Sequence, residues 1–113
     1  ATIDDEALMD AVTAVSGSGP AYVFHFIECL TAAAEAAGLP AETSRLLAMQ
    51  TVYGAAALAA ESRTEPGELR RQVTSPNGTT AAALSVLMGE DRLKMLVTEA
   101  VEAARLRSVE LGK

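Results

Sequence analysis

Cysteine, histidine, aromatic side chains and positive charge are all scarce in this sequence of 113 residues. The single cysteine, Cys29, has no partner for an intrachain disulfide. Together with the only histidine, His25, it cannot supply the set of Cys and His ligands that holds zinc. The sequence therefore predicts no metal site, and it favours a reducing, cytoplasmic setting.

Basic residues are too few and too scattered for a nucleic-acid-binding protein. The formal net charge is −6, with nine Lys and Arg residues against 15 Asp and Glu. Neutralising phosphates requires clustered basic side chains, so nucleic acid is excluded as a partner. No apolar run reaches the roughly 18 residues of a membrane span, so no membrane association is predicted. No signal peptide opens the sequence. Because the first residue is Ala and not Met, we expect a piece of a longer polypeptide.

Alanine accounts for much of the apolar content. Half of the residues are hydrophobic, but only 4% are aromatic and there is no tryptophan. Small side chains let helices approach closely, yet each one buries little area and stabilises the fold less than Leu or Phe. Two paired copies would share a larger core, so the composition indicates oligomerisation.

The apolar residues recur with helical periodicity, and no segment alternates as a half-buried strand does. We therefore predict a single all-α domain over residues 1–113. About six helices are expected, at residues 4–15, 20–38, 40–62, 65–73, 79–88 and 90–111. Thr64 is a candidate N-cap for the fourth helix, and Gly38 suits the left-handed end of the second. The second helix is apolar around most of its circumference, so we expect its neighbours to enclose it.

The third expected helix contains a long uncharged stretch. From Met49 to Ala60 no residue carries a charge, which is roughly 18 Å of helix. Within it, Gly54 and the alanines that follow would permit close contact with a partner backbone. This stretch indicates a helix that is central or lies at an interface.

A first glycine-bearing turn, Ser16-Gly17-Ser18-Gly19-Pro20, joins the first two expected helices. A dinucleotide-binding fingerprint requires a preceding strand and a third glycine, and Tyr22 occupies that third position. The fingerprint therefore fails. A tight connection between two packed helices is the favoured interpretation.

A second turn, Thr74-Ser75-Pro76-Asn77-Gly78-Thr79-Thr80, precedes the fifth expected helix. Asn77 and Gly78 both tolerate left-handed dihedral angles. We expect the N–H groups of Gly78, Thr79 and Thr80 to be free at the positive end of the helix dipole. Such a helix start suits a carboxylate or a phosphate. Ordinary helix capping is the alternative, and the spacing alone leaves it open.

His25 and Cys29 are four residues apart on the second expected helix. This spacing makes a Cys–His nucleophile pair conceivable, but no third orienting group is evident from the sequence. A histidine that packs or bonds to a neighbour is the favoured interpretation.

Two segments together resemble one family. Residues 11–22, Ala-Val-Thr-Ala-Val-Ser-Gly-Ser-Gly-Pro-Ala-Tyr, are similar to the segment that opens the C-terminal domain of pyrroline-5-carboxylate reductases. Residues 69–80 resemble the signature of that family, in which a hydrophobic residue precedes Ser-Pro-Gly-Gly, a small residue and Thr. Asn77 stands where the family usually has the first of the two glycines. The resemblance extends over essentially all 113 residues.

The resemblance implies the domain that follows an N-terminal Rossmann domain and interlocks with a second copy as a homodimer, or as part of a higher oligomer. The family reduces 1-pyrroline-5-carboxylate to L-proline, the last step of proline biosynthesis, with NADPH or NADH. The Rossmann domain, which this sequence lacks, mainly binds that cofactor. The chain is therefore expected to be dimeric and inactive alone.

The resemblance also implies roles for particular residues. The Thr80 hydroxyl would lie near the ring nitrogen of the substrate and is the candidate catalytic group. Thr13 and Ser16 would lie near the nicotinamide end of the cofactor. The implied substrate-binding set is Val73, Ser75, Asn77, Gly78, Thr79 and Thr80.

Two other functions remain open from the sequence. One is a non-catalytic helical dimerisation module, in which the Ser-Pro-Asn-Gly turn only caps a helix. The other is the C-terminal domain of a different reductase of the β-hydroxyacid-dehydrogenase type.

Overall fold

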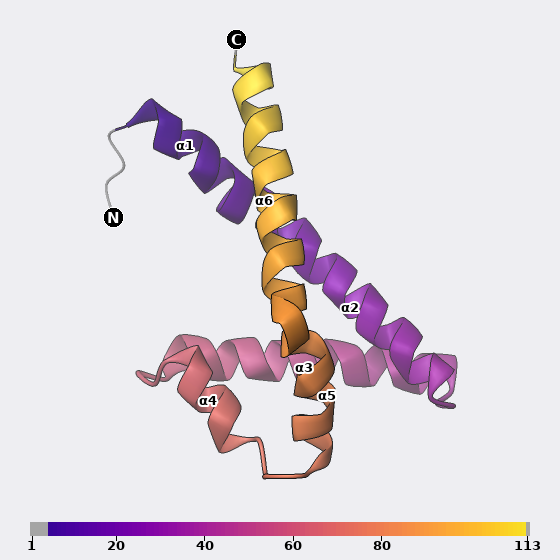
Figure 1. Ribbon diagram of the computed structural model, residues 1–113. Helices are drawn as coiled ribbons and strands as arrows, with labels where there is room; N and C mark the ends of the chain where they lie inside the picture. Colours follow the sequence, from indigo (N-terminus) through magenta and orange to yellow (C-terminus); the bar gives the residue numbers. More distant parts are fainter. Residues whose placement is uncertain (1–4, 113) are drawn as a thin grey trace. The chain divides into compact units, whose positions relative to one another are not determined.

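The computed structural model of the protein describes residues 5–112, which are helical for most of their length (Figure 1). Four of the α-helices have ten or more residues, and α1 and α4 have seven each. Residues 5–112 contain no strand, so the predicted all-α fold is confirmed. The elements in chain order are α1 (Glu6–Val12), the π-helical η1 (Thr13–Gly17), α2 (Gly19–Ala36), α3 (Ala41–Glu61), α4 (Pro66–Gln72), α5 (Thr79–Met88), the 3₁₀-helical η2 (Gly89–Asp91) and α6 (Arg92–Leu111).

The end of α2 shows how glycine sets a boundary. Gly38 has φ 108°, a left-handed conformation that costs glycine little. The N–H of Gly38 donates to the carbonyl of Glu35 at 2.9 Å, and the N–H of Leu39 donates to that of Ala34 at 3.2 Å. These two bonds are the Schellman pattern, which satisfies the last carbonyls of the helix. The helix end predicted at Gly38 is confirmed.

Three other predicted boundaries are wrong. The first helix is α-helical only to Val12, after which the N–H of Ser18 donates to the carbonyl of Thr13 at 3.0 Å in a π turn. The predicted start at Asp4 lies outside the described residues. Glu65, not Thr64, precedes α4. The last helix begins at Arg92 and not at residue 90, because Glu90 and Asp91 have φ 56° and 55° and leave the right-handed helical region.

Contacts along the chain define two compact units. One contains the residues up to Tyr22 and those from Ala82 onward, and the other contains Val23–Ala81. A single domain over residues 1–113 stays a prediction. Helices α2 and α5 each cross the boundary between the units.

In the first unit, α6 packs against α1 and η1 (Figure 1). Ala14 in η1 is fully buried. The hydroxyl of Ser108 on α6 donates to the carboxylate of Asp10 on α1 at 2.7 Å. The pKa of Arg105 is raised mainly by its hydrogen bond to Glu102, and the Asp10 carboxylate adds to that shift. Asp10 therefore ties the N-terminal helix to two residues of α6.

Replacing Ser108 by Ala tests this link between α1 and α6. We expect the free energy of unfolding to fall by about 1 kcal/mol, since a hydrogen bond to a charged group is lost while Ala slightly favours the helix. Urea unfolding at fixed protein concentration measures the change. Thr98→Ala on the same helix is the matched control, because the Thr98 hydroxyl bonds only to the carbonyl of Lys94. Equal stability of the two variants would contradict a stabilising role for Ser108.

In the second unit, α3 follows α2 after the left-handed turn at Gly38 (Figure 1). Ser44 and Ala48 on α3 are buried, and the Ser44 hydroxyl donates to the carbonyl of Leu39 at 3.4 Å. The two helices border an open groove of about 310 Å³. The residues that line it are Leu30, Ala33, Ala34, Leu47, Ala48 and Thr51.

Most large apolar side chains are exposed. Among the residues whose side chains are described, only Ala14, Ser44 and Ala48 are buried. No residue of Gly19–Ala36 is buried, so the neighbours of α2 within the chain do not enclose it as expected. The apolar side chains that the chain leaves exposed are therefore available to a partner surface.

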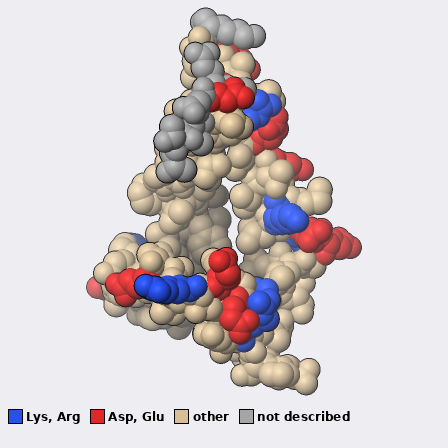
Figure 2. All heavy atoms as spheres, turned by 90° about the vertical axis from the view of Figure 1, so that its left-hand side faces the viewer, with Lys and Arg blue, Asp and Glu red and all other residues tan. Residues whose placement is uncertain are grey.

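Charged side chains contribute little to holding the helices together. The Arg–Glu ion pairs found in residues 5–112 join residues three apart on one helix, and their side chains are largely exposed, so each one adds little stability. The hydrogen bond from Arg105 lowers the pKa of Glu102. Figure 2 shows acidic and basic side chains side by side in separate groups, with uncharged surface between them. In the described part of the chain, no helix has the length and apolar character needed to cross a membrane.

Candidate functional site

The turn before α5 is held by one backbone hydrogen bond. The N–H of Gly78 donates to the carbonyl of Ser75 at 3.0 Å. Pro76 follows Ser75, and Asn77 has φ 61°. Proline at the second position and a left-handed residue at the third are the pattern of a type II turn. Asn77 thus takes the left-handed conformation that its residue type was predicted to tolerate.

A close approach favours glycine at residue 78. A Cβ added there would lie 3.2 Å from the carbonyl oxygen of Ser75, so the backbone of the turn would have to shift by a few tenths of an ångström. The N–H of Gly78 is already donated to that carbonyl, so the prediction that it is free is wrong. The reason is that the turn uses this N–H to close itself before α5 begins.

Hydrogen-bonding groups do remain open at the start of α5. Thr79 and Thr80 are its first two residues, and no partner in residues 5–112 engages their N–H groups or their hydroxyls. Thr79 is exposed and Thr80 is half-buried. The first turn of α5 carries no acidic residue, so the positive end of the helix dipole is not neutralised locally. This helix start can accept an anion.

The other predicted substrate-binding residues border this helix start in the sequence. Ser75 is exposed, and no residue of the described chain hydrogen-bonds to its hydroxyl. Val73 is 69% exposed at the end of α4. The side chain that follows it is held in place, since the Thr74 hydroxyl donates to the carbonyl of Arg70 at 2.6 Å. Residues 73–80 therefore form a short, locally ordered segment of the second unit.

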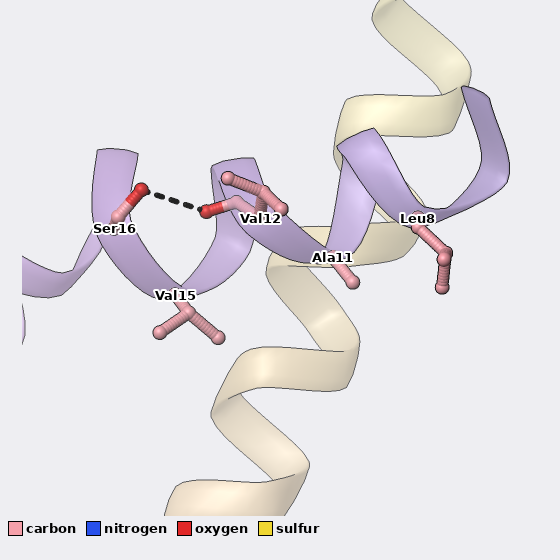
Figure 3. Close-up of a pocket in the computed structure, with 5 residues that line it drawn as sticks. All are labelled: Leu8, Ala11, Val12, Val15 and Ser16. Atoms are coloured by element: carbon pink, nitrogen blue, oxygen red, sulfur yellow. Dashed lines mark hydrogen bonds between the residues drawn. The ribbon is translucent and has the colours of Figure 1, made fainter. Parts of the chain in front are cut away.

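Thr13 and Ser16, the predicted cofactor contacts, belong to the first unit. Both are exposed, and the Ser16 hydroxyl donates to the carbonyl of Val12 at 3.1 Å. Figure 3 shows Ser16 at one end of an open hollow along α1 and η1. The hollow has a volume of about 340 Å³, and the residues that line it are Leu8, Ala11, Val12, Val15 and Ser16. Its lining surface is entirely apolar, because the Ser16 hydroxyl is turned to the Val12 carbonyl.

Tyr22 stabilises η1 in a way that sequence reasoning missed. Its hydroxyl donates to the carbonyl of Ala14 at 2.7 Å, across eight residues of the chain. The bond anchors the π turn to the first residues of α2. The presence of a tyrosine next to a glycine-rich helix junction could have suggested such an anchor.

The structure supplies a third member for the His25–Cys29 pair. Cys29 Sγ lies 3.5 Å from His25 Nε2, and Glu28 Oε1 lies 3.1 Å from His25 Nδ1. The prediction that no orienting group is present is therefore wrong. The three-residue spacing between His25 and Glu28 could have revealed this group, because side chains three residues apart on a helix are neighbours. All three side chains are exposed on one face of α2. No group of ligands suited to a metal ion occurs in residues 5–112.

An all-helical chain with so much exposed apolar surface belongs to the class of domains that complete their core with another chain. The chain is a member of the pyrroline-5-carboxylate reductase dimerisation family, whose profile matches residues 6–111. The family resemblance in the sequence is thereby confirmed. The chain corresponds to the C-terminal domain of such reductases.

Individual relatives agree with the family. The chain is 52% identical to a pyrroline-5-carboxylate reductase of Pseudomonas aeruginosa over 98% of its own length and 40% of that protein. It superimposes on the reductase of Coxiella burnetii with a TM-score of 0.92 and 45% identity, over 98% of this chain and 41% of that one. A pyrroline carboxylate reductase of Plasmodium falciparum, solved with NADP bound, gives a TM-score of 0.89 and 39% identity over 97% of this chain and 42% of that one. The chain thus spans about 40% of the length of the curated relatives it matches.

Proposed function

We propose that this chain is the dimerisation and substrate-binding part of an enzyme that reduces 1-pyrroline-5-carboxylate to L-proline with NAD(P)H. The family match is the main support, and the open start of α5 is the feature of the structure that fits the chemistry. A pyrroline-5-carboxylate molecule carries one carboxylate, which needs several donors, and this helix start offers them where no acidic residue competes. The proposed compartment is the cytoplasm, which suits a chain with one cysteine.

The donors at α5 divide between two tasks. The N–H groups of Thr79 and Thr80, with the Ser75 hydroxyl, hold the substrate carboxylate. Since the Gly78 N–H closes the turn, Gly78 acts in this site by allowing the close approach to Ser75. The Thr80 hydroxyl then faces the ring nitrogen, where it orients the imine and relays a proton to it, regaining its own proton from solvent water. Val73 lines the apolar side of the ring.

The cofactor residues are part of the same proposal. Thr13 and Ser16 present exposed hydroxyls beside an apolar hollow, which suits the carboxamide and the flat ring of a nicotinamide. When bound, NAD(P)H supplies the hydride that reduces the C=N bond. Most of the cofactor would be held by a separate Rossmann domain. The relatives are long enough to contain such a domain, because this chain spans only about 40% of their length. The chain on its own is therefore proposed to be inactive.

Self-association is proposed to occur along one stripe of α3, which we call the α3 seam: Leu46, Met49, Tyr53, Ala56 and Ala60. These residues recur at intervals of three and four and so share one face of the helix. All five are exposed, with Tyr53 at 70% and Leu46 at 59%. Beside the seam, an added Cβ on Gly54 would meet nothing within 4 Å, which leaves room for a partner backbone. A second copy of this chain is the proposed partner.

The substrate site is tested by adding L-proline to the isotopically labelled chain. We expect the amide resonances of Thr79 and Thr80 to shift in a concentration-dependent way, because the product keeps the carboxylate that their N–H groups bind. The Thr98 amide in α6 is the internal control and should not move. Light scattering on the same sample should give the mass of a dimer. If the Thr79 and Thr80 amides stay unmoved in the folded protein, α5 is only capped and the chain is a non-catalytic dimerisation module.

A further inference from the structure

The hydroxyl of Tyr22 reaches back along the chain to the buried residue of η1. It donates to the carbonyl of Ala14 at 2.7 Å, and Tyr22 itself is half-buried. Ala14 is 0% exposed, and η1 packs against α6. The bond therefore joins the start of α2 to a part of η1 that packing against α6 already holds in place.

The backbone at the junction of η1 and α2 is short of a donor. Pro20, in the first turn of α2, has no N–H group and cannot donate to a carbonyl of η1. The pairing in η1 is also shifted by one residue, because the N–H of Ser18 donates to the carbonyl of Thr13 at 3.0 Å, five residues back. Tyr22, also in the first turn of α2, brings a hydroxyl donor to η1 instead.

The π-helical pairing affects how Thr13 and Ser16 are presented. A π turn contains more residues than an α turn, so its side chains are rotated about the axis by different steps. Both residues lie in η1 and are exposed. The Ser16 hydroxyl donates its proton to the carbonyl of Val12, which leaves its oxygen as an acceptor for the amide group of a nicotinamide. The residues present therefore fit the cofactor end assigned to them.

We propose that Tyr22 is a positioning residue for the cofactor, because its bond to Ala14 holds η1 in the π-helical form in which Thr13 and Ser16 meet the nicotinamide together. The inference rests on the proposed function, since it uses the same two hydroxyls. It adds a residue that makes no contact with the cofactor and acts through the backbone of η1.

Removing the Tyr22 hydroxyl from the full-length enzyme tests this role. Tyr22→Phe keeps the ring, and the Kd for NADPH, read from the fluorescence of the cofactor, should rise about five- to tenfold, as expected for one lost hydrogen bond. The KM for 1-pyrroline-5-carboxylate should not change, because its carboxylate donors belong to α5. In the cofactor-free enzyme, the peptide that spans η1 should exchange its amide hydrogens faster.

Thr98→Val is the matched control for the lost bond. The Thr98 hydroxyl also donates to a backbone carbonyl at 2.7 Å, that of Lys94, and it belongs to the same compact unit as η1. We expect neither the Kd for NADPH nor the exchange of η1 to change in this variant. An equal loss of NADPH affinity in Thr98→Val and Tyr22→Phe would overturn the inference, since it would reflect general destabilisation.

A double-mutant cycle shows whether Tyr22 acts through the two hydroxyls. If it does, adding Tyr22→Phe to the variant Thr13→Val/Ser16→Ala causes no further loss of NADPH affinity. Additive losses overturn the inference, and so does a Tyr22→Phe enzyme that binds NADPH as the wild type does. Normal NADPH binding by Thr13→Val/Ser16→Ala has a different meaning, because it contradicts the cofactor contacts of the proposed function and removes the basis of the inference with them.

Discussion

Replacing Tyr53 by Glu is expected to dissociate the protein into monomers. Tyr53 is 70% exposed in the middle of the α3 seam, and no charged residue occurs between Met49 and Ala60. A carboxylate there would be buried against an apolar partner without a counter-charge, which costs several kcal/mol. At 1.4 kcal/mol per tenfold, the dissociation constant should rise by about 100- to 1,000-fold. Analytical ultracentrifugation across a concentration series measures this change.

Thr43→Glu is the matched control for the seam. It adds the same charge to the same helix, but in the first turn beside Glu42, where a negative charge favours the helix dipole. We expect its dissociation constant to equal that of the wild type. A Tyr53→Glu protein that stays dimeric at low micromolar concentration would move the interface away from the α3 seam. The groove between α2 and α3 would then be the next surface to test.

Replacing Thr80 by Val is expected to reduce kcat/KM for 1-pyrroline-5-carboxylate by roughly 100-fold, at the lower end of the effect of a positioned proton donor. Valine keeps the shape of threonine and the helix start, and it removes only the hydroxyl. Steady-state kinetics of the full-length enzyme provide the measurement. The loss should fall mainly on kcat, because the carboxylate still binds to the N–H groups of Thr79 and Thr80.

Two further substitutions make the assignment of Thr80 specific. Thr80→Ser restores a hydroxyl and should recover most of the activity. Thr79→Val removes the neighbouring hydroxyl, which has no proton-transfer role in the proposal, and should cost less than about tenfold. Equal losses in Thr79→Val and Thr80→Val would show that both hydroxyls serve only binding. In that case the proton reaches the ring nitrogen by another route.

Local rules made several boundaries predictable. The helix from Thr79 to Met88 was predicted with both ends correct, because a proline turn precedes it and Gly89 follows it. The stop at Gly38 was predictable because only glycine takes φ 108° at little cost. The helix from Ala41 to Glu61 lies within one residue of the predicted range, since Pro40 cannot continue a helix from the preceding side.

The wrong predictions share one physical cause. The local backbone conformation at these positions depends on hydrogen bonds and dihedral angles that the periodicity of apolar residues does not reveal. The π turn at Thr13–Gly17 is joined to Tyr22, eight residues on, by the hydrogen bond from its hydroxyl to the carbonyl of Ala14. The left-handed pair Glu90 and Asp91 contains no glycine to signal it. At the candidate site, the residue types pointed to a free N–H on Gly78, and only the folded turn showed that Ser75 accepts it.

The sequence by itself determined the helices, the family and the segment that carries the proposed substrate site, because each depends on local periodicity, proline and glycine positions or a short motif. The tertiary structure decided which groups remain open. Within residues 5–112, no partner engages the N–H and hydroxyl groups of Thr79 and Thr80 or the side chain of Asn77, and the α3 seam is exposed. The physical reason is that burial and hydrogen-bond satisfaction depend on what lies next to a residue in space. In residues 5–112, the chain alone does not cover its own apolar faces.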